Sequence, residues 1–228
     1  QWNFFDKVQL DKFSKNKESK KRYDNELSYN YDWKKNKILL EVGCGAGRFL
    51  EYSIKEAKLI VGVDLSNSVD AVYKNFYQYT NLLLVQADLY NLPFKKKLFD
   101  GIYSIGVIQH TPDPVKSIKT IMNYVKKNGV FGFTMYEKKK WTLFNGKYVI
   151  RHITKHLPPK FTLLIIVLLM PILFPLTQLF FKIPFFGKIL SFIIPVCDYT
   201  KIKDLSLKDR YMGVLLDTFD MLAPSFDK

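Results

Sequence analysis

Cysteine and histidine are scarce in this chain: two cysteines, Cys44 and Cys197, and three histidines occur among 228 residues. Two cysteines so far apart make neither a disulfide framework nor a Cys–His metal-binding pattern, so we expect no metal site. Unpaired thiols are typical of a reducing compartment, which predicts a cytoplasmic protein.

Acidic residues are also few, with 21 Asp and Glu against 35 Lys and Arg and a net charge of +14. A basic chain favours anionic partners such as nucleic acid, anionic lipid or a phosphorylated substrate. The lysines are scattered, however, and no nucleic-acid-binding motif accompanies them. We therefore expect no nucleic-acid partner, and the charge is also explained by a solvated, lysine-rich surface.

The chain lacks an initiator methionine and a signal peptide, since it begins with Gln1 and a polar, lysine-rich segment. We therefore expect the sequence to be a fragment at its N-terminus. At 48% hydrophobic and 25% charged residues, it has the composition of a folded globular domain.

Short apolar runs alternate with segments of helical periodicity between residues 37 and 136. Strands are predicted at 37–42, 58–64, 81–88, within 99–108 and at 129–136, and helices at 47–57, 68–79 and 114–130. Strands that are apolar on both faces and alternate with helices predict an α/β fold. We expect a Rossmann-like, doubly wound parallel sheet in a three-layer αβα arrangement.

Three domains are predicted from the changes in composition. Residues 1–37 form an N-terminal extension of one or two short helices, 38–136 the Rossmann-like core, and 137–228 a helical, hydrophobic insertion after strand five.

The stretch "LEVGCGAGRF" places Gly43, Gly45 and Gly47 between the first strand and its helix. Glycines there let the backbone approach a ligand closely, beside the N–H groups that open the helix. Asp64 ends the second strand about 20 residues later, where an acid can accept hydrogen bonds from ribose hydroxyls. Glycines used only for packing are one alternative. A nicotinamide-binding G-x-G-x-x-G turn is another, although the third glycine here comes one residue early.

With "VGVDLS", "QADLYNLPF" and "FDGIYSIGVIQHTPDP" following in order, residues 38–136 resemble a class I S-adenosylmethionine-dependent methyltransferase. The resemblance is to the group that includes the ubiquinone-type small-molecule enzymes. It implies S-adenosylmethionine as the cofactor.

The resemblance also implies roles for the matched residues. Gly43, Gly45 and Gly47 would line the methionine and sugar end of the cofactor, with Cys44 a small filler in that loop, and Glu41 would support the loop or meet the methionine amino group. The ribose and adenine side would comprise Asp64, Leu65, Ser66, Asp88 and Leu89, and the floor near the sulfonium would be Ser104, Ile105 and Gly106.

His110 is the candidate catalytic residue, because it follows the fourth strand and should face the cleft. A general base assists methyl transfer when the acceptor is a hydroxyl. His110 has two alternatives, a structural role and a role in positioning the substrate. The expected reaction is O- or C-methylation of a small-molecule or lipid-linked acceptor.

Two other functions remain open. The fold could act as a non-catalytic, membrane-associated partner or adaptor, against which the intact set of glycines and acids argues. Nucleic-acid methylation would agree with the net charge, but the chain reads Ser104-Ile105-Gly106-Val107 where an Asn/Asp-Pro-Pro-Tyr-type motif would stand.

Residues Phe161–Phe181 are 21 residues without a charge, interrupted by Pro171 and Pro175. Proline inside an apolar run predicts short, broken helices. Three interpretations stay open for the apolar region: a soluble lid over the acceptor site, a peripheral membrane contact through 160–197 at the inner face of the membrane, and a membrane span.

The ending "LLDTFDMLAPSFD" (215–227) resembles a subgroup of the family in which a helix and the last strand pair follow. We therefore expect a truncated C-terminus, with the final strand pair of the sheet missing.

Overall fold

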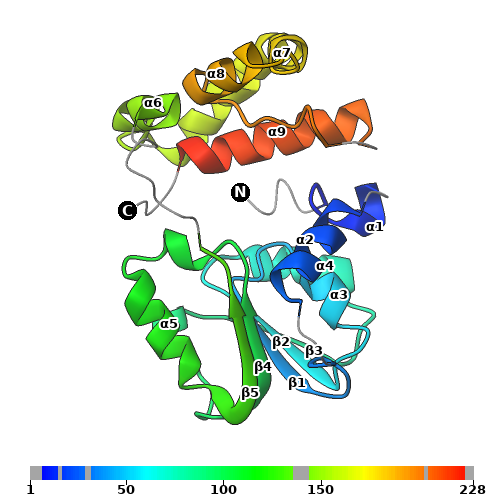
Figure 1. Cartoon of the computed structure of the whole chain (residues 1–228). Helices are drawn as coiled ribbons and strands as arrows, with labels where there is room; N and C mark the ends of the chain where they lie inside the picture. Colours follow the sequence, from blue (N-terminus) through cyan, green and yellow to red (C-terminus); the bar gives the residue numbers. More distant parts are fainter. Residues whose placement is uncertain (1–6, 15–16, 29–31, 136–143, 203–204, 224–228) are drawn as a thin grey trace. The chain divides into compact units, whose positions relative to one another are not determined.

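The computed structural model describes residues 7–14, 17–28, 32–135, 144–202 and 205–223 (Figure 1). The chain divides into two compact units, Gln1–Tyr136 with Phe226–Lys228, and Glu137–Ser225. The expected end of the core at Tyr136 and the end of the 215–227 motif lie outside the described residues. The three predicted domain boundaries stay predictions.

Unit 1 is built on five strands: β1 (Ile38–Val42), β2 (Leu59–Asp64), β3 (Leu82–Gln86), β4 (Phe99–Ser104) and β5 (Val125–Phe133). They pair in the order β3-β2-β1-β4-β5, and every pair is parallel. The predicted Rossmann-like, doubly wound sheet is confirmed. The order reverses between β1 and β4, and ligands of such sheets bind at the carboxyl ends of the strands beside that point.

Alternate residues of the strands face two separate apolar cores. Leu39 and Ile60 join one core with α2 (Glu18–Glu26), α3 (Leu50–Ser53) and α4 (Ser68–Phe76). Their neighbours Leu40 and Val61 join the other with α5 (Pro114–Met122) and the short turns η1 (Leu89–Asn91) and η2 (Ile108–His110). Because successive side chains of a strand point to opposite faces, this division places helices on both sides of the sheet.

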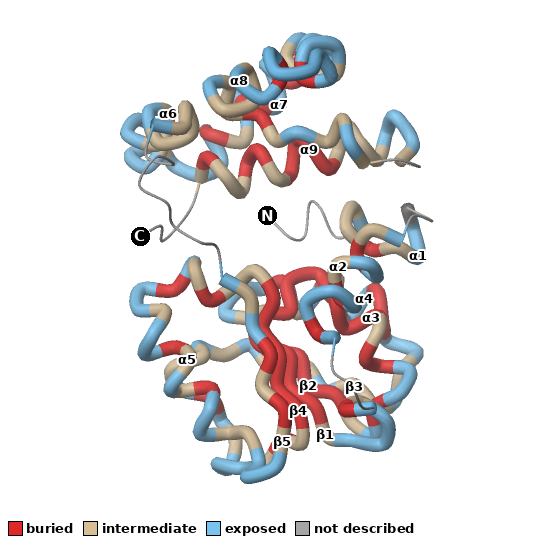
Figure 2. The backbone as a smooth tube through the Cα atoms, in the orientation of Figure 1, coloured by how far each residue is buried: buried red, intermediate tan, exposed pale blue. Residues whose placement is uncertain are grey.

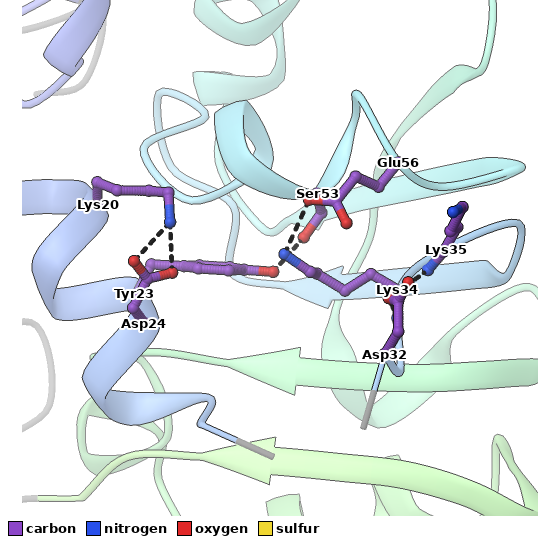
Figure 3. Close-up of polar contacts among 8 residues, drawn as sticks. All are labelled: Lys20, Tyr23, Asp24, Asp32, Lys34, Lys35, Ser53 and Glu56. Atoms are coloured by element: carbon purple, nitrogen blue, oxygen red, sulfur yellow. Dashed lines mark hydrogen bonds and ion pairs between the residues drawn. The ribbon is translucent and has the colours of Figure 1, made fainter. Parts of the chain in front are cut away.

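The described N-terminal residues pack into unit 1 as the short helices α1 (Asp11–Ser14) and α2. Tyr23 of α2 is buried, its hydroxyl is hydrogen-bonded to Ser53 of α3, and Lys34 reaches Glu56 at 3.1 Å (Figure 3). The Tyr23 ring also meets the Tyr103 ring of β4 edge-on, with centroids 5.9 Å apart. These residues therefore belong to the same core as the sheet.

All three helices predicted in unit 1 are shorter in the structure, and α4 ends at Phe76 rather than at residue 79. The helix predicted at 47–57 is reduced to α3, because Gly47 has a φ of +91° that no α-helix contains. The helix predicted at 114–130 ends at Met122, and β5 begins at Val125. The backbone N–H of Phe99 donates to Tyr124 O at 3.0 Å, which draws the chain into the sheet before Gly129 is reached.

Unit 2 is helical and contains α6 (Gly146–Thr154), α7 (Pro159–Phe180), α8 (Phe186–Ile193) and α9 (Leu207–Leu222). The prediction of proline-broken helices was wrong for α7, which runs through Pro171 and Pro175. Both prolines are exposed, whereas the residue directly before each of them, Met170 and Phe174, is buried on the side that packs on α9. Packing on that side maintains the helix where proline removes two backbone hydrogen bonds. Within the described residues, α7 is the one helix long and apolar enough to cross a membrane.

Candidate cofactor and active site

The turn after β1 depends on glycine. Gly43, Gly45 and Gly47 have φ angles of +78°, +51° and +91°, a region that other residues rarely adopt. A Cβ on Gly43 would come within 2.4 Å of the Val107 side chain, and one on Gly47 within 2.6 Å of Phe76. The glycines are therefore required by the local backbone itself.

Backbone hydrogen bonds fix this turn to the end of β2. The N–H groups of Gly43 and Cys44 both donate to Val63 O, at 2.7 and 3.0 Å. The Cys44 side chain is buried, and burial raises the pKa of its thiol well above the usual range. Its sulfur lies 3.3 Å from where a Cβ on Gly62 would be, so Cys44 fills space rather than offering a reactive thiolate.

Asp64 connects the glycine turn to the segment after β2. Its Oδ2 accepts from Gly45 N at 3.0 Å, and its Oδ1 accepts from Ser66 N at 2.9 Å and Ser66 Oγ at 2.7 Å. A carboxylate has about four acceptor positions. Two hydroxyl donors from a ligand would therefore fit if the Ser66 hydroxyl turned away, because that hydroxyl occupies one of the places a ligand would use.

The adenine side of the expected site lies at the adjacent strand end. Ala87 N donates to Asp64 O at 3.0 Å, which brings the segment after β3 beside the segment after β2. Asp88 is exposed there, and its Oδ1 accepts from Tyr90 N at 2.9 Å. Leu65 is 67% exposed and Leu89 half-buried, so both are accessible to a ring bound at this edge.

Glu41 is buried in β1 and its Oε2 accepts a hydrogen bond from the Tyr103 hydroxyl at 3.0 Å. The two residues are register partners on β1 and β4. Burial raises the pKa of Glu41 well above its usual range, and the hydrogen bond from Tyr103 and the nearby Asp64 modify that shift. Just before the glycine turn, the chain therefore holds a buried carboxyl group whose protonated form is favoured.

The end of β4 closes the floor of this edge. Ser104 is fully buried and donates its hydroxyl to Val42 O at 2.9 Å, joining β4 to β1. Ile105 is buried, and Gly106 has a φ of +74° with its N–H donating to Thr134 Oγ1 at 2.8 Å.

His110 ends the η2 turn and is exposed. Its backbone N–H donates to Val107 O at 2.9 Å, and the Val107 side chain packs against Gly43, so the η2 turn begins beside the glycine turn although the two are far apart in sequence. The structure thus places the glycine turn, Asp64, Ser66, Asp88, Ser104 and Gly106 at one edge of the sheet.

Sequence reasoning missed Tyr103, Arg22 and Gln109. Both polar atoms of the Gln109 amide are buried without a hydrogen-bond partner among the described residues. Gln109 and Arg22 of α2 both lie beside Gly106. A Cβ added to Gly106 would be 4.0 Å from Gln109 Nε2 and 3.4 Å from Arg22 Nη2. The position of Gln109 directly before His110 was a signal in the sequence, but the unpaired amide becomes evident only in the folded chain.

A hollow of about 290 Å³ lies elsewhere, where Lys37, Asp100 and Lys126 surround the amino ends of β1 and β4. It is at the opposite edge of the sheet from the glycine turn, so it is not part of this site. Among the described residues, no group of three or more His, Cys, Asp or Glu could hold a metal ion.

Comparisons with known proteins identify the class of this domain. Residues 40–133 match the sequence profile described as "Methyltransferase domain". The chain contains a class I S-adenosylmethionine-dependent methyltransferase domain. S-adenosylmethionine is the cofactor of this class, and the spare acceptor capacity of Asp64 beside a close-approach glycine turn is suited to its ribose.

Two curated proteins are examples of the relatives of this domain. The ubiquinone biosynthesis O-methyltransferase of Coxiella burnetii is 30% identical over 127 residues, which cover 53% of this chain and 54% of that protein. The tRNA U34 carboxymethyltransferase of Campylobacter curvus is 34% identical over 104 residues, 44% of this chain and 35% of that protein. The chain thus spans about half or less of the length of these curated relatives.

Among solved structures, the YcgJ protein of Bacillus subtilis is similar, with a TM-score of 0.48 and 19% identity over 58% of each chain.

Proposed function

We propose that this chain is an S-adenosylmethionine-dependent methyltransferase that methylates an oxygen or carbon atom of a small-molecule or lipid-linked acceptor. The observation that carries the proposal is the network in which Asp64 binds Gly45 N at the switch point of the sheet and can accept two further donors if the Ser66 hydroxyl turns away. We also place the protein in the cytoplasm, at the inner face of the membrane.

Each residue matched to the family would then contact a different part of the cofactor. Asp64 would hold the ribose, Asp88 the adenine amino group, and Glu41 the glycine turn or the methionine amino group. The remaining contacts would come from Gly43, Cys44, Gly45, Gly47, Leu65, Ser66, Leu89, Ser104, Ile105 and Gly106.

When bound, S-adenosylmethionine supplies an electrophilic methyl group on a sulfonium. Such a transfer needs mainly alignment of the acceptor and exclusion of water. An imidazole nitrogen of His110 would take the proton of an acceptor hydroxyl. The unpaired amide of Gln109 would orient the acceptor, because leaving a buried amide unpaired costs about 1–3 kcal/mol that a bound polar group recovers.

A small or lipid-linked acceptor is favoured over nucleic acid by the chemistry of the exposed residues of unit 2. The longest helix there, α7, exposes apolar side chains and has no charge between Phe161 and Phe181. A nucleic-acid surface would instead carry cations along the path of the phosphates. The name of the Coxiella relative also supports a small-molecule acceptor.

Titration calorimetry of the full chain with S-adenosylmethionine tests the binding site. We expect a micromolar Kd, and Asp64→Ala should weaken it by about 10- to 100-fold, the ~1.5–3 kcal/mol of a hydrogen bond to a charged group. Asp70→Ala is the matched control, because Asp70 is an exposed acid on α4. Equal affinity of the Asp64→Ala and Asp70→Ala proteins would refute the assignment of the ribose site.

The acceptor class is tested by transfer of a radiolabelled methyl group to separated fractions of a bacterial extract. Label in the small-molecule or lipid fraction is the expected result, and His110→Ala should slow its appearance. Label confined to tRNA would overturn the acceptor class while leaving the cofactor site intact.

A further inference from the structure

The helix α7 has its most hydrophobic side chains on the outside. The stripe that is buried against α9 and the rest of unit 2 includes two threonines, and consists of Thr162, Ile166, Met170, Phe174 and Thr177. From Phe161 to the end of α7 the exposed large side chains are all apolar: Phe161, Leu164, Ile165, Val167, Leu168, Leu169, Ile172, Leu176, Leu179 and Phe180. Figure 2 shows α7 mostly in the colour of exposed residues. A surface helix in water has the opposite arrangement.

The same surface continues onto the next helix. The connection from α7 to α8 and the exposed side of α8 add Ile183, Phe185, Phe186, Ile189 and Ile193, and α7 and α8 pack against each other. We call these exposed side chains of the two helices the α7–α8 surface. Apolar surfaces of this extent mark sites of interaction rather than ordinary solvent-facing regions.

The charges in the sequence segment that carries the α7–α8 surface are all of one sign. From Phe144 to Cys197 the sequence contains six Lys or Arg and no Asp or Glu. Of these, Lys160, Lys182 and Lys188 are exposed at the ends of α7 and within α8. An apolar face bordered by cations with no acid is the composition of helices that lie in the interface of an anionic bilayer.

We propose that the α7–α8 surface is a monotopic membrane-binding surface that inserts into the interface of an anionic lipid bilayer. One consequence of this proposal, that the acceptor is reached from the lipid phase, rests on the proposed function. The binding of the surface to lipid does not. Binding to lipid itself requires no catalysis and can be measured separately.

The contacts of α7 with α9 favour an in-plane position over a membrane span. Arg210 of α9 donates to Gln178 Oε1 of α7 at 3.4 Å and to Ile202 O at 2.9 Å. Tyr199 and Asp217 are hydrogen-bonded on the same side of unit 2. A spanning α7 would bring Arg210 and Asp217 into hydrocarbon with it, at a high cost. With α7 in the plane of the interface, α9 stays on the aqueous side.

The charge pattern also disfavours a second copy of the chain as the occupant. Two α7–α8 surfaces face to face would bring two sets of cations together with no acid from either set between residues 144 and 197. Like charges at an apolar interface oppose association, whereas anionic headgroups attract both the cations and the apolar side chains.

Vesicle flotation of the full chain tests the proposal. We expect it to float with vesicles of phosphatidylcholine mixed with phosphatidylglycerol, less with phosphatidylcholine alone, and less when salt is raised. The double variant Leu168→Glu/Ile172→Glu should lose on the order of tenfold or more of the binding. The matched control is Tyr73→Glu/Tyr77→Glu, which adds the same charge at exposed apolar positions of α4 and the turn after it and should float like the unchanged chain.

Affinity for S-adenosylmethionine is measured on the same proteins. Unchanged affinity in Leu168→Glu/Ile172→Glu shows that the variant is folded, so a failure to float is separate from a failure of the proposed function. Flotation that survives this double variant, or that resists alkaline carbonate extraction as a span does, would overturn the proposal. A dimer in detergent-free buffer that the same variant dissociates would assign the surface to a second copy instead. If the unchanged chain binds no vesicles and the double variant loses methyl transfer to a water-soluble acceptor, the α7–α8 surface would be a lid instead.

Discussion

The helices α4 and α7 place their apolar residues on opposite sides. In α4, Val72 and Phe76 are buried against the sheet while Asp70 and Lys74 face outward. In α7, Thr162 and Thr177 are buried while Leu168 and Ile172 are 66% and 64% exposed. The helix α4 thus presents its charged residues to water, whereas α7 exposes side chains that are suited to an apolar environment.

The buried polar groups of the two units differ as well. In unit 1, Glu41 and Ser104 are buried with hydrogen-bond partners and lie at the edge that we assign to the cofactor. In unit 2, the hydroxyl of Thr162 is buried with no partner among the described residues, and that of Thr177 donates to Phe174 O at 2.9 Å in its own helix. The burial of Glu41 and Ser104 therefore accompanies the proposed cofactor site, whereas the burial of Thr162 and Thr177 accompanies the reversed orientation of α7.

The comparison is tested most directly by the same leucine-to-alanine substitution in each unit. Leu50→Ala, at a fully buried position of α3, should lower the free energy of unfolding by about 2–5 kcal/mol because it leaves a cavity. Leu168→Ala should change it by about 0.5 kcal/mol or less, since its side chain is already largely in solvent. Urea unfolding followed by circular dichroism measures both. A large loss in Leu168→Ala would show that α7 is covered in solution and would break the comparison.

The pH dependence of stability tests the buried carboxyl of unit 1. Burial raises the pKa of Glu41 above its ordinary value of 4.5, so the folded state binds the proton more tightly than the unfolded chain. The contribution of Glu41 is then fully present below about pH 4.5 and is lost as the pH rises toward the folded pKa, with a slope of at most about 1.4 kcal/mol per pH unit. Urea unfolding across this range should show a shallower decline for Glu41→Gln than for the unchanged chain.

Proton release on cofactor binding distinguishes the two roles proposed for Glu41. If Glu41 meets the amino group of the cofactor, binding should release a proton, and calorimetry in two buffers of different ionisation enthalpy would detect it. A Glu41 that only supports the glycine turn through Tyr103 would keep its proton. In the stability experiment, free energies of unfolding that change in parallel with pH for the unchanged chain and Glu41→Gln would contradict the raised pKa of Glu41.

The smallest expected effect concerns the buried stripe of α7. Thr162→Val removes a buried hydroxyl that has no partner among the described residues and should stabilise unit 2 by about 1 kcal/mol. Thr177→Val is the matched change, and it should cost about 0.5–1 kcal/mol because this hydroxyl has a partner. Thermal unfolding followed by circular dichroism ranks the two. A reversed order would mean that the hydroxyl of Thr162 is bound to a group outside the described residues.

Much of unit 1 could be predicted from the sequence. Apolar runs separated by glycine located all five strands, and the motif residues Gly43, Asp64 and Asp88 lie at strand ends, where the chain order alone placed them. The start of β5 could not be found in this way. Residues 114–130 have helical periodicity, and only the pairing of Phe99 with Tyr124 ends the helix early.

Other features depend on contacts between distant segments. The bond from Tyr103 to Glu41 requires the register of β1 and β4, and the unpaired amide of Gln109 requires the folded turn. Proline has a strong local tendency to break helices, so the continuity of α7 follows only from its packing on α9.

The N-terminal residues of unit 1 have a practical consequence for work on this protein. Tyr23, Leu27 and Trp33 are buried in the same core as Tyr103 of β4 and as Ile105, which directly follows β4 at the floor of the proposed cofactor edge. A truncated gene that starts at the first strand would look like a minimal catalytic domain in an alignment. Its product would lack three side chains that fill the interior, and would be a poor starting point for crystallisation or inhibitor screening.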